Sequence, residues 1–103
     1  RPALLMAKKA TTAAERRHME RVSHMPCLVC DTWPVHVHHV HSDGMKRIGK
    51  SNWLVAPLCP EHHQGDTGVH ALGHAGFTAR YDVDLLWRAT QLRDQSPHWT
   101  GSE

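Results

Sequence analysis

Three cysteines and eleven histidines dominate the chemistry open to this chain of 103 residues. Cysteine sulfur and neutral imidazole nitrogen are the preferred protein ligands of zinc and related transition metals. Most of the histidines fall between His36 and His74, where they are dispersed among Val, Pro and Gly, so a purification tag does not explain them. The sequence therefore points first to metal binding.

All three cysteines belong to two closely spaced pairs of possible ligands. The pairs are Cys27-x-x-Cys30 and Cys59-x-x-His62. A gap of two residues lets both side chains of a turn converge on one tetrahedral ion, and three cysteines cannot all pair with one another. We predict a structural Zn²⁺ bound by these four side chains, with no position open to water. In the alternative interpretation, Cys27 and Cys30 are ordinary buried residues.

A further set of histidines is left over once His62 is assigned to the zinc. His63 follows directly, at the start of a possible helix, and His38-His39 lie on a possible strand. A strand that carries His38 could meet His63 there. Together they could hold a second ion that keeps open coordination positions.

Residues 27–63 resemble the zinc-binding branch of the HNH endonucleases, which have the ββα-metal fold. The family pattern runs from C-x-x-C through a His-His pair on the first strand and an Asn to Leu-Cys-x-x-(Cys or His)-His at the start of a helix. This chain has His38-His39, Asn52 and then Pro57-Leu58-Cys59-Pro60-Glu61-His62-His63 in the same order.

The resemblance implies a role for each matching residue. His38 and His63 would be ligands of a catalytic divalent ion, and His39 would be the general base that takes a proton from the attacking water. Asn52 lies in the region of the family's Asn, which orients the base. Because neighbours on a regular strand face opposite ways, an exchange of roles between His38 and His39 is also compatible with the sequence.

A third ligand of the catalytic ion is expected a few residues after the helix begins, by the same resemblance. We predict His70, with His74 as the alternative, although a solvent-exposed loop histidine is an equally simple interpretation of either residue. His36 would share a strand face with His38 and could hydrogen-bond a ligand, although a surface position is the simpler interpretation for it and for His41. The ion could be Mg²⁺, Mn²⁺, Ni²⁺ or Zn²⁺, of which an imidazole-rich site suits Mg²⁺ least.

A looser resemblance extends through residues 68–77. The longer pattern is similar to phage and prophage nucleases, including the recombination-enhancement, RecA-dependent group. It implies a DNA endonuclease that hydrolyses phosphodiester bonds in DNA recombination or processing, with a recombinase–DNA filament as a possible partner. Lys46, Arg47 and Lys50 could contact DNA phosphates, or could simply form a solvated basic loop. The net charge of +2 permits such contacts. The alternative function is a zinc-stabilised nucleic-acid-binding module without catalysis, which needs only the four zinc ligands.

The elements that must position these residues predict a single small α+β domain. Thr12-Ala13-Ala14-Glu15 has the spacing of a capping box and predicts a helix that ends near His24. Strands are expected over 35–40 and 53–58, followed by a helix that begins at Pro60. Glycines interrupt the stretch after it, and a last helix is expected over 84–95. Trp33, Trp53 and Trp87 are expected to lie in the core or to pack against it.

The domain boundaries follow from the same pattern. We expect the nuclease domain over residues 6–96 with its core at 26–76, a vector scar or processed remnant at 1–5, and a flexible tail at 97–103. With one Phe and one Tyr, the core is thin enough to need a metal as a staple. No secretory signal or long apolar run is present, which favours the cytoplasm of a bacterial host cell and no contact with a membrane. The oligomeric state is left open.

Overall fold

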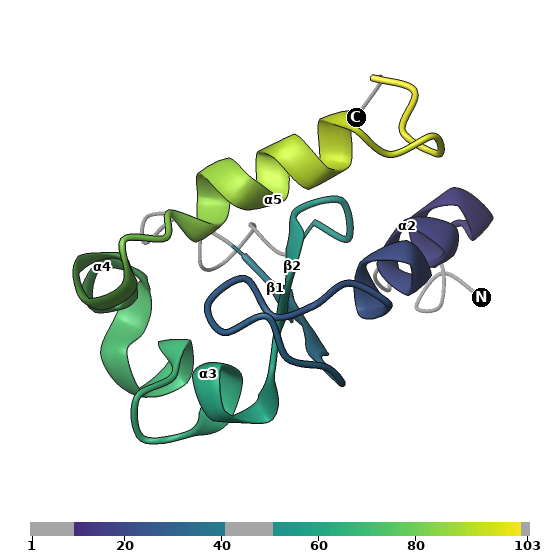
Figure 1. Cartoon of the computed structure of the whole chain (residues 1–103). Helices are drawn as coiled ribbons and strands as arrows, with labels where there is room; N and C mark the ends of the chain where they lie inside the picture. Colours follow the sequence, from purple (N-terminus) through teal and green to yellow (C-terminus); the bar gives the residue numbers. More distant parts are fainter. Residues whose placement is uncertain (1–9, 41–50, 102–103) are drawn as a thin grey trace, which may run out of the picture.

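The computed structural model describes residues 10–40 and 51–101 of the chain. The predicted DNA contacts Lys46, Arg47 and Lys50 lie outside the described residues, as does His41. The described elements, in chain order, are α2 (Ala13–Ser23), β1 (His36–His39), β2 (Val55–Leu58), α3 (Pro60–Gln64), α4 (Val69–Tyr81) and α5 (Leu85–Asp94) (Figure 1). The fold is α+β, as the sequence predicts.

Helix α2 begins at the predicted capping box. The backbone N–H of Glu15 donates to Thr12 Oγ1 at 3.1 Å, and the backbone N–H of Thr12 donates to Glu15 Oε1 at 2.8 Å. These two bonds satisfy donors that a helix N-terminus otherwise leaves unpaired. The buried face of the helix carries His18 and Val22, which are fully buried.

Strands β1 and β2 form an antiparallel hairpin in which His36 lies opposite Leu58 and His39 opposite Val55. All four residues of β2 are buried, because α2 and α5 both contact this strand. Helix α3 follows β2 almost at once, so the centre of the domain is a ββα arrangement (Figure 1). None of the described helices is long and apolar enough to cross a bilayer.

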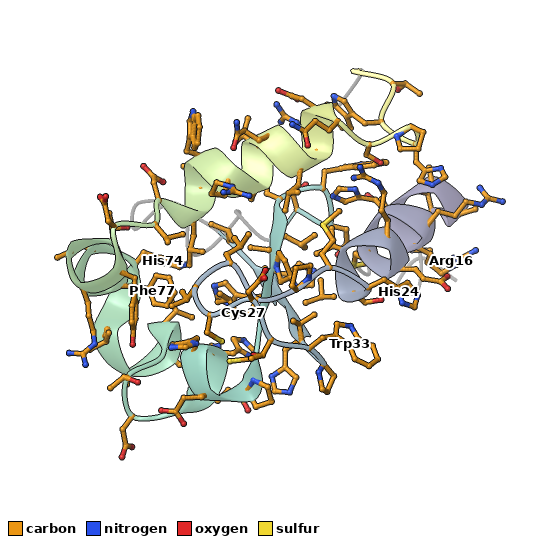
Figure 2. The ribbon with its side chains drawn as sticks, in the orientation of Figure 1. Arg16, His24, Cys27, Trp33, His74 and Phe77 are labelled. Atoms are coloured by element: carbon orange, nitrogen blue, oxygen red, sulfur yellow. The ribbon has the colours of Figure 1, made fainter. Side chains whose placement is uncertain are left out.

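The tryptophan predictions are right at one position of three. Trp53 is only 3% exposed, and its ring packs on Trp99 with 4.9 Å between centroids. Trp33 and Trp87 are 61% and 59% exposed, so the prediction that they lie in the core is wrong. Trp33 stands on the loop before β1, where its Nε1–H donates to the carbonyl of Ser23 at 3.0 Å (Figure 2).

The glycine-rich stretch after α3 is more ordered than the sequence indicates. It forms α4, which is interrupted only at Gly73, where φ is 75° and the helix kinks. Two other glycines allow close backbone contacts with α3. A Cβ at Gly65 would lie 2.5 Å from the carbonyl oxygen of Glu61, and a Cβ at Gly68 would lie 2.7 Å from the same atom. A side chain at Gly68, the N-cap of α4, would therefore push α4 away from α3, whereas one at Gly65 would clash with α3, the helix that it ends.

Candidate metal centres

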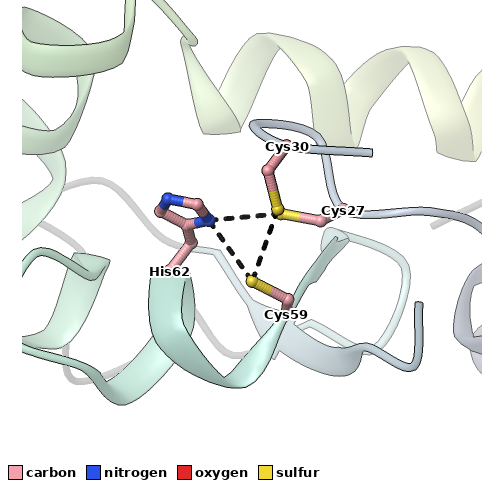
Figure 3. Close-up of side chains that lie close together, drawn as sticks. All are labelled: Cys27, Cys30, Cys59 and His62. Atoms are coloured by element: carbon pink, nitrogen blue, oxygen red, sulfur yellow. Dashed lines mark hydrogen bonds between the residues drawn. The ribbon is translucent and has the colours of Figure 1, made fainter. Parts of the chain in front are cut away.

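The four predicted zinc ligands come together at one end of the hairpin (Figure 3). Cys27 and Cys30 lie in the loop between α2 and β1, Cys59 follows β2, and His62 lies in α3. Their ligand atoms all lie within 4.8 Å of one another. The Cys30–Cys59 Sγ distance is 3.7 Å, and His62 Nδ1 lies 3.3 Å from Cys59 Sγ and 3.7 Å from Cys27 Sγ.

These distances fit a tetrahedral ion. With Zn–S bonds of about 2.3 Å, two sulfurs on a tetrahedron lie about 3.8 Å apart. The cysteines are free thiols rather than a disulfide. We call this set of Cys27, Cys30, Cys59 and His62 the sulfur cluster. It could hold a structural zinc, and with four protein ligands it leaves no position for water.

A tight turn presents the first two cysteines. The N–H of Asp31 donates to the carbonyl of Cys27 at 2.9 Å, and the N–H of Cys27 donates to the carbonyl of Thr32 at 2.8 Å. Hydrogen bonds from Thr32 lower the pKa of Cys30 to about 6, whereas burial raises the pKa of Cys27. The exposed thiol of Cys30 is thus stabilised in the deprotonated form that binds metal.

A second cluster contains only imidazoles. The ligand nitrogens of His38, His63 and His70 lie within 4.8 Å of one another. They come from β1, α3 and α4 respectively, so three elements meet at this point. The distance from His63 Nε2 to His70 Nε2 is 3.0 Å. With M–N bonds of about 2.05 Å, two nitrogens on a tetrahedral ion lie about 3.3 Å apart, so this set could bind a further metal.

Two more histidines extend this histidine cluster. His36 Nδ1 lies 2.8 Å from His63 Nδ1, and His38 Nε2 lies 3.2 Å from His74 Nε2. Both candidates for the third ligand, His70 and His74, are therefore near the site, and His70 is the one that completes the triad. We use histidine cluster for these five residues.

Electrostatics favour the neutral form of two rings in this cluster. Burial, followed by the charge repulsion of neighbouring imidazoles, lowers the pKa of His38 to about 3 and that of His63 to about 4. Both rings therefore carry a free lone pair near neutral pH, which is the form that coordinates a metal.

His39 and Asn52 lie together, outside the triad. Nε2 of His39 is 2.8 Å from Oδ1 of Asn52, whose amide nitrogen is 3.5 Å from Thr11 Oγ1. An amide oxygen only accepts, so His39 carries its proton on Nε2. His39 is the last residue of β1, next to the buried His38, and its ring keeps partial exposure.

Helix α3 is shared by the two clusters. His62 belongs to the sulfur cluster and His63 to the histidine cluster. Adjacent residues of an α-helix project about 100° apart, so a single turn can direct the two rings to different centres. The backbone of Cys59 begins this helix and Pro60 is its first residue, which fixes the direction of both imidazoles.

Comparison of the chain with protein-family models, with curated proteins and with solved structures gives no match. What the protein does is therefore inferred from its own geometry. The contact of His36 with His63 is the feature that sequence reasoning undervalued. The only signal for it was the shared strand face of His36 and His38, which alternation along a strand provides.

Proposed function

We propose that the protein is a metal-dependent DNA endonuclease of the HNH type, which hydrolyses phosphodiester bonds. The observation that supports this proposal most is the triad of His38, His63 and His70 on a ββα arrangement, separate from a complete set of zinc ligands. A module that only binds nucleic acid needs the sulfur cluster alone. This alternative function does not explain the second group of imidazoles, which comes from three elements.

The geometry favours His38 as ligand and His39 as general base. A base must hold a proton at some stage, and His38 is buried with a pKa lowered to about 3. His39 keeps partial exposure, and its Nε2–H is committed to Asn52 at 2.8 Å. Its Nδ1 therefore carries the lone pair and can take a proton from an attacking water. Asn52 would fix this tautomer and the orientation of the ring.

A divalent ion held by His38, His63 and His70 would supply electrostatic stabilisation of the scissile phosphate and the leaving oxygen. The three imidazoles would hold this ion in place. The exposed position of His70 leaves the triad accessible from solvent. Nitrogen ligands favour Mn²⁺, Ni²⁺ or Zn²⁺ over Mg²⁺. We assign DNA as the substrate and Lys46, Arg47 and Lys50 as its phosphate contacts. A recombinase–DNA filament as partner and a bacterial host cytoplasm as location complete this proposal.

The test is a nicking assay on supercoiled plasmid with each of Mg²⁺, Mn²⁺, Ni²⁺ and Zn²⁺. We expect the wild type to cut with at least one ion. His39→Ala should slow cutting by about 10²–10⁴-fold, the usual contribution of a general base. His24→Ala is the matched control, because His24 is an exposed residue at the end of α2.

The outcomes separate the alternatives. No cutting with any of the four ions contradicts the enzyme proposal. If the plasmid is bound but stays intact, the chain is a zinc-stabilised nucleic-acid-binding module. If His39→Ala cuts as fast as the wild type, the proposed base is wrong while the activity stands.

A further inference from the structure

His63 has a partner at each of its two ring nitrogens. Its Nε2 lies 3.0 Å from Nε2 of His70, at the position where the triad would hold an ion. Its Nδ1 lies 2.8 Å from Nδ1 of His36. The rings of His36 and His63 meet edge to face, with 5.0 Å between centroids and 76° between planes. Nothing in the catalytic scheme above uses His36.

The proton positions at this contact are linked to metal binding. A neutral imidazole carries one proton, so one of the two facing Nδ1 atoms donates and the other accepts. If the proton of His63 were on Nε2, that nitrogen could not bind an ion. When Nε2 binds, the proton of His63 is on Nδ1, and His36 must accept it there.

We propose that His36 is a positioning residue, which accepts the Nδ1–H of His63 and so holds Nε2 of His63 ready for the metal. The inference rests on the metal site of the proposed function, but not on the cutting of DNA. His36 acts through His63 and is not a ligand itself.

Strand geometry explains how one short strand provides both groups. Residues two apart on a strand face the same way, so β1 presents His36 and His38 to the same side. His38 enters the triad directly, while His36 orients the ligand that comes from α3. In many metal sites a carboxylate or a backbone carbonyl accepts the second N–H of a ligating histidine. Here an imidazole occupies that position.

Three substitutions separate the acceptor from mere packing. His36→Leu keeps a side chain of similar bulk but removes the acceptor. His36→Asn offers an amide oxygen close to the place of Nδ1, and His36→Asp offers a charged one. His24→Leu is the control for the loss of an exposed imidazole.

The first measurement is the zinc affinity of the histidine cluster, by chelator competition on the full chain without DNA. Co²⁺ substitution follows the sulfur cluster separately, since only thiolates give sulfur-to-metal charge-transfer bands. We expect His36→Leu to weaken zinc binding at the histidine cluster by about 10–100-fold, the usual effect of removing such a partner. His36→Asn should stay near the wild type, and His36→Asp should bind as tightly or more tightly. The sulfur cluster should be unchanged in all three.

The second measurement is the imidazole NMR spectrum of the zinc-loaded protein. We expect a His63 Nδ1–H resonance that exchanges slowly with water in the wild type and in His36→Asn, and that is lost in His36→Leu. An affinity of His36→Leu within twofold of the wild type would overturn the inference. So would an equal loss in the Leu and Asn variants, because packing alone would then explain both. These results do not depend on whether plasmid is cut, so the two proposals can fail separately.

Discussion

The sulfur cluster and the histidine cluster are built in opposite ways from one short helix. The sulfur cluster takes its ligands as two pairs, each within four residues of chain, from a turn and from the start of α3. The histidine cluster takes one triad ligand from each of β1, α3 and α4, and even the nearest two, His63 and His70, are seven residues apart and lie in different helices. A site made of local pairs can form as soon as two turns meet. A site made of distant single residues needs the fold to exist first.

Metal binding at the histidine cluster should therefore depend on zinc in the sulfur cluster, whereas the sulfur cluster should not depend on the histidine cluster. Cys59 begins α3, and the same helix carries His63 to the triad. Zinc in the sulfur cluster would fix α3 against the loop of Cys27, and so would fix one ligand of the second site. Loss of the histidine cluster removes nothing from this arrangement. The predictions below test this asymmetry, from the largest expected effect to the smallest.

The largest effect should come from Cys59→Ser. Structural zinc contributes about 10–16 kcal/mol of apparent binding energy in zinc-finger peptides, far more than a core with so few aromatic residues can replace. We expect the variant to lose zinc from both clusters and to lose its cooperative unfolding transition in circular dichroism. Chelator treatment of the wild type is the matched comparison and should reproduce the result. Cooperative melting at the wild-type temperature without zinc would show that the fold does not need the structural zinc.

His70→Ala should separate activity from stability. His70 is an exposed ligand, so its removal creates no cavity in the core. We expect nicking to fall by more than about a hundredfold, since a ligand matters more than the partners that support it. The melting temperature should stay close to that of the zinc-loaded wild type, with His24→Ala as control. If melting falls as far as in Cys59→Ser, the two clusters form one cooperative unit and the asymmetry is absent.

A smaller effect is expected at His18, which lies away from both clusters. Its Nε2–H donates to the carbonyl of Trp53 at 3.2 Å, and burial is the main cause that lowers its pKa below 6.5. The unfolded chain therefore takes up a proton at this site more readily than the folded one. The stability contribution is complete above pH 6.5 and declines as the pH falls below that value, by at most about 1.4 kcal/mol per pH unit.

The matched variant is His18→Gln, which keeps a donor for Trp53 but does not titrate in this range. Denaturant unfolding from pH 7.5 to 5.5 should show a steeper loss of stability for the wild type than for the variant. The zinc ligands protonate in both proteins, so the difference between the two curves reports His18. Parallel curves would contradict the assignment.

The smallest effect should come from Thr12→Ala, which removes the cap of α2. Loss of an N-cap side chain costs about 1 kcal/mol. We expect that decrease in the free energy of unfolding by urea titration, with full metal content in both clusters. Thr12→Ser keeps the hydroxyl and should restore stability. A loss of metal in Thr12→Ala would mean that α2 supports the clusters more directly than its contacts indicate.

The sequence predicts well what depends on neighbours along the chain. The capping box of Thr12 and Glu15 is local, and both of its hydrogen bonds are present. The pairing of Cys27 with Cys30, and of Cys59 with His62, is local as well, which is why residue spacing is enough to predict the sulfur cluster. The hairpin and the helix at Pro60 follow from alternation and a helix-start residue in the same way.

The errors concern features that only tertiary contacts decide. Trp33 and Trp87 are as apolar as Trp53, but only Trp53 lies where α2, β2 and the C-terminal segment meet. Helix α4 forms despite its glycines because Val69 and Phe77 are buried in the core on either side of the kink. The contact between His36 and His63 joins residues of different elements, so strand alternation can place His36 on the face of His38, but only the fold brings it to His63.

The adjacency of His62 and His63 has a consequence for insertions and deletions rather than for substitutions. One residue added or removed between Cys59 and His63 would turn at least one imidazole by about 100° around the axis of α3. Gly65 and Gly68 already lie in close contact with Glu61 and His62, so the chain after α3 cannot shift to compensate for the change in length. A library of single-residue insertions across the chain, sorted for zinc content, should therefore be empty over residues 59–63. In evolutionary terms, these five positions form a segment of fixed length.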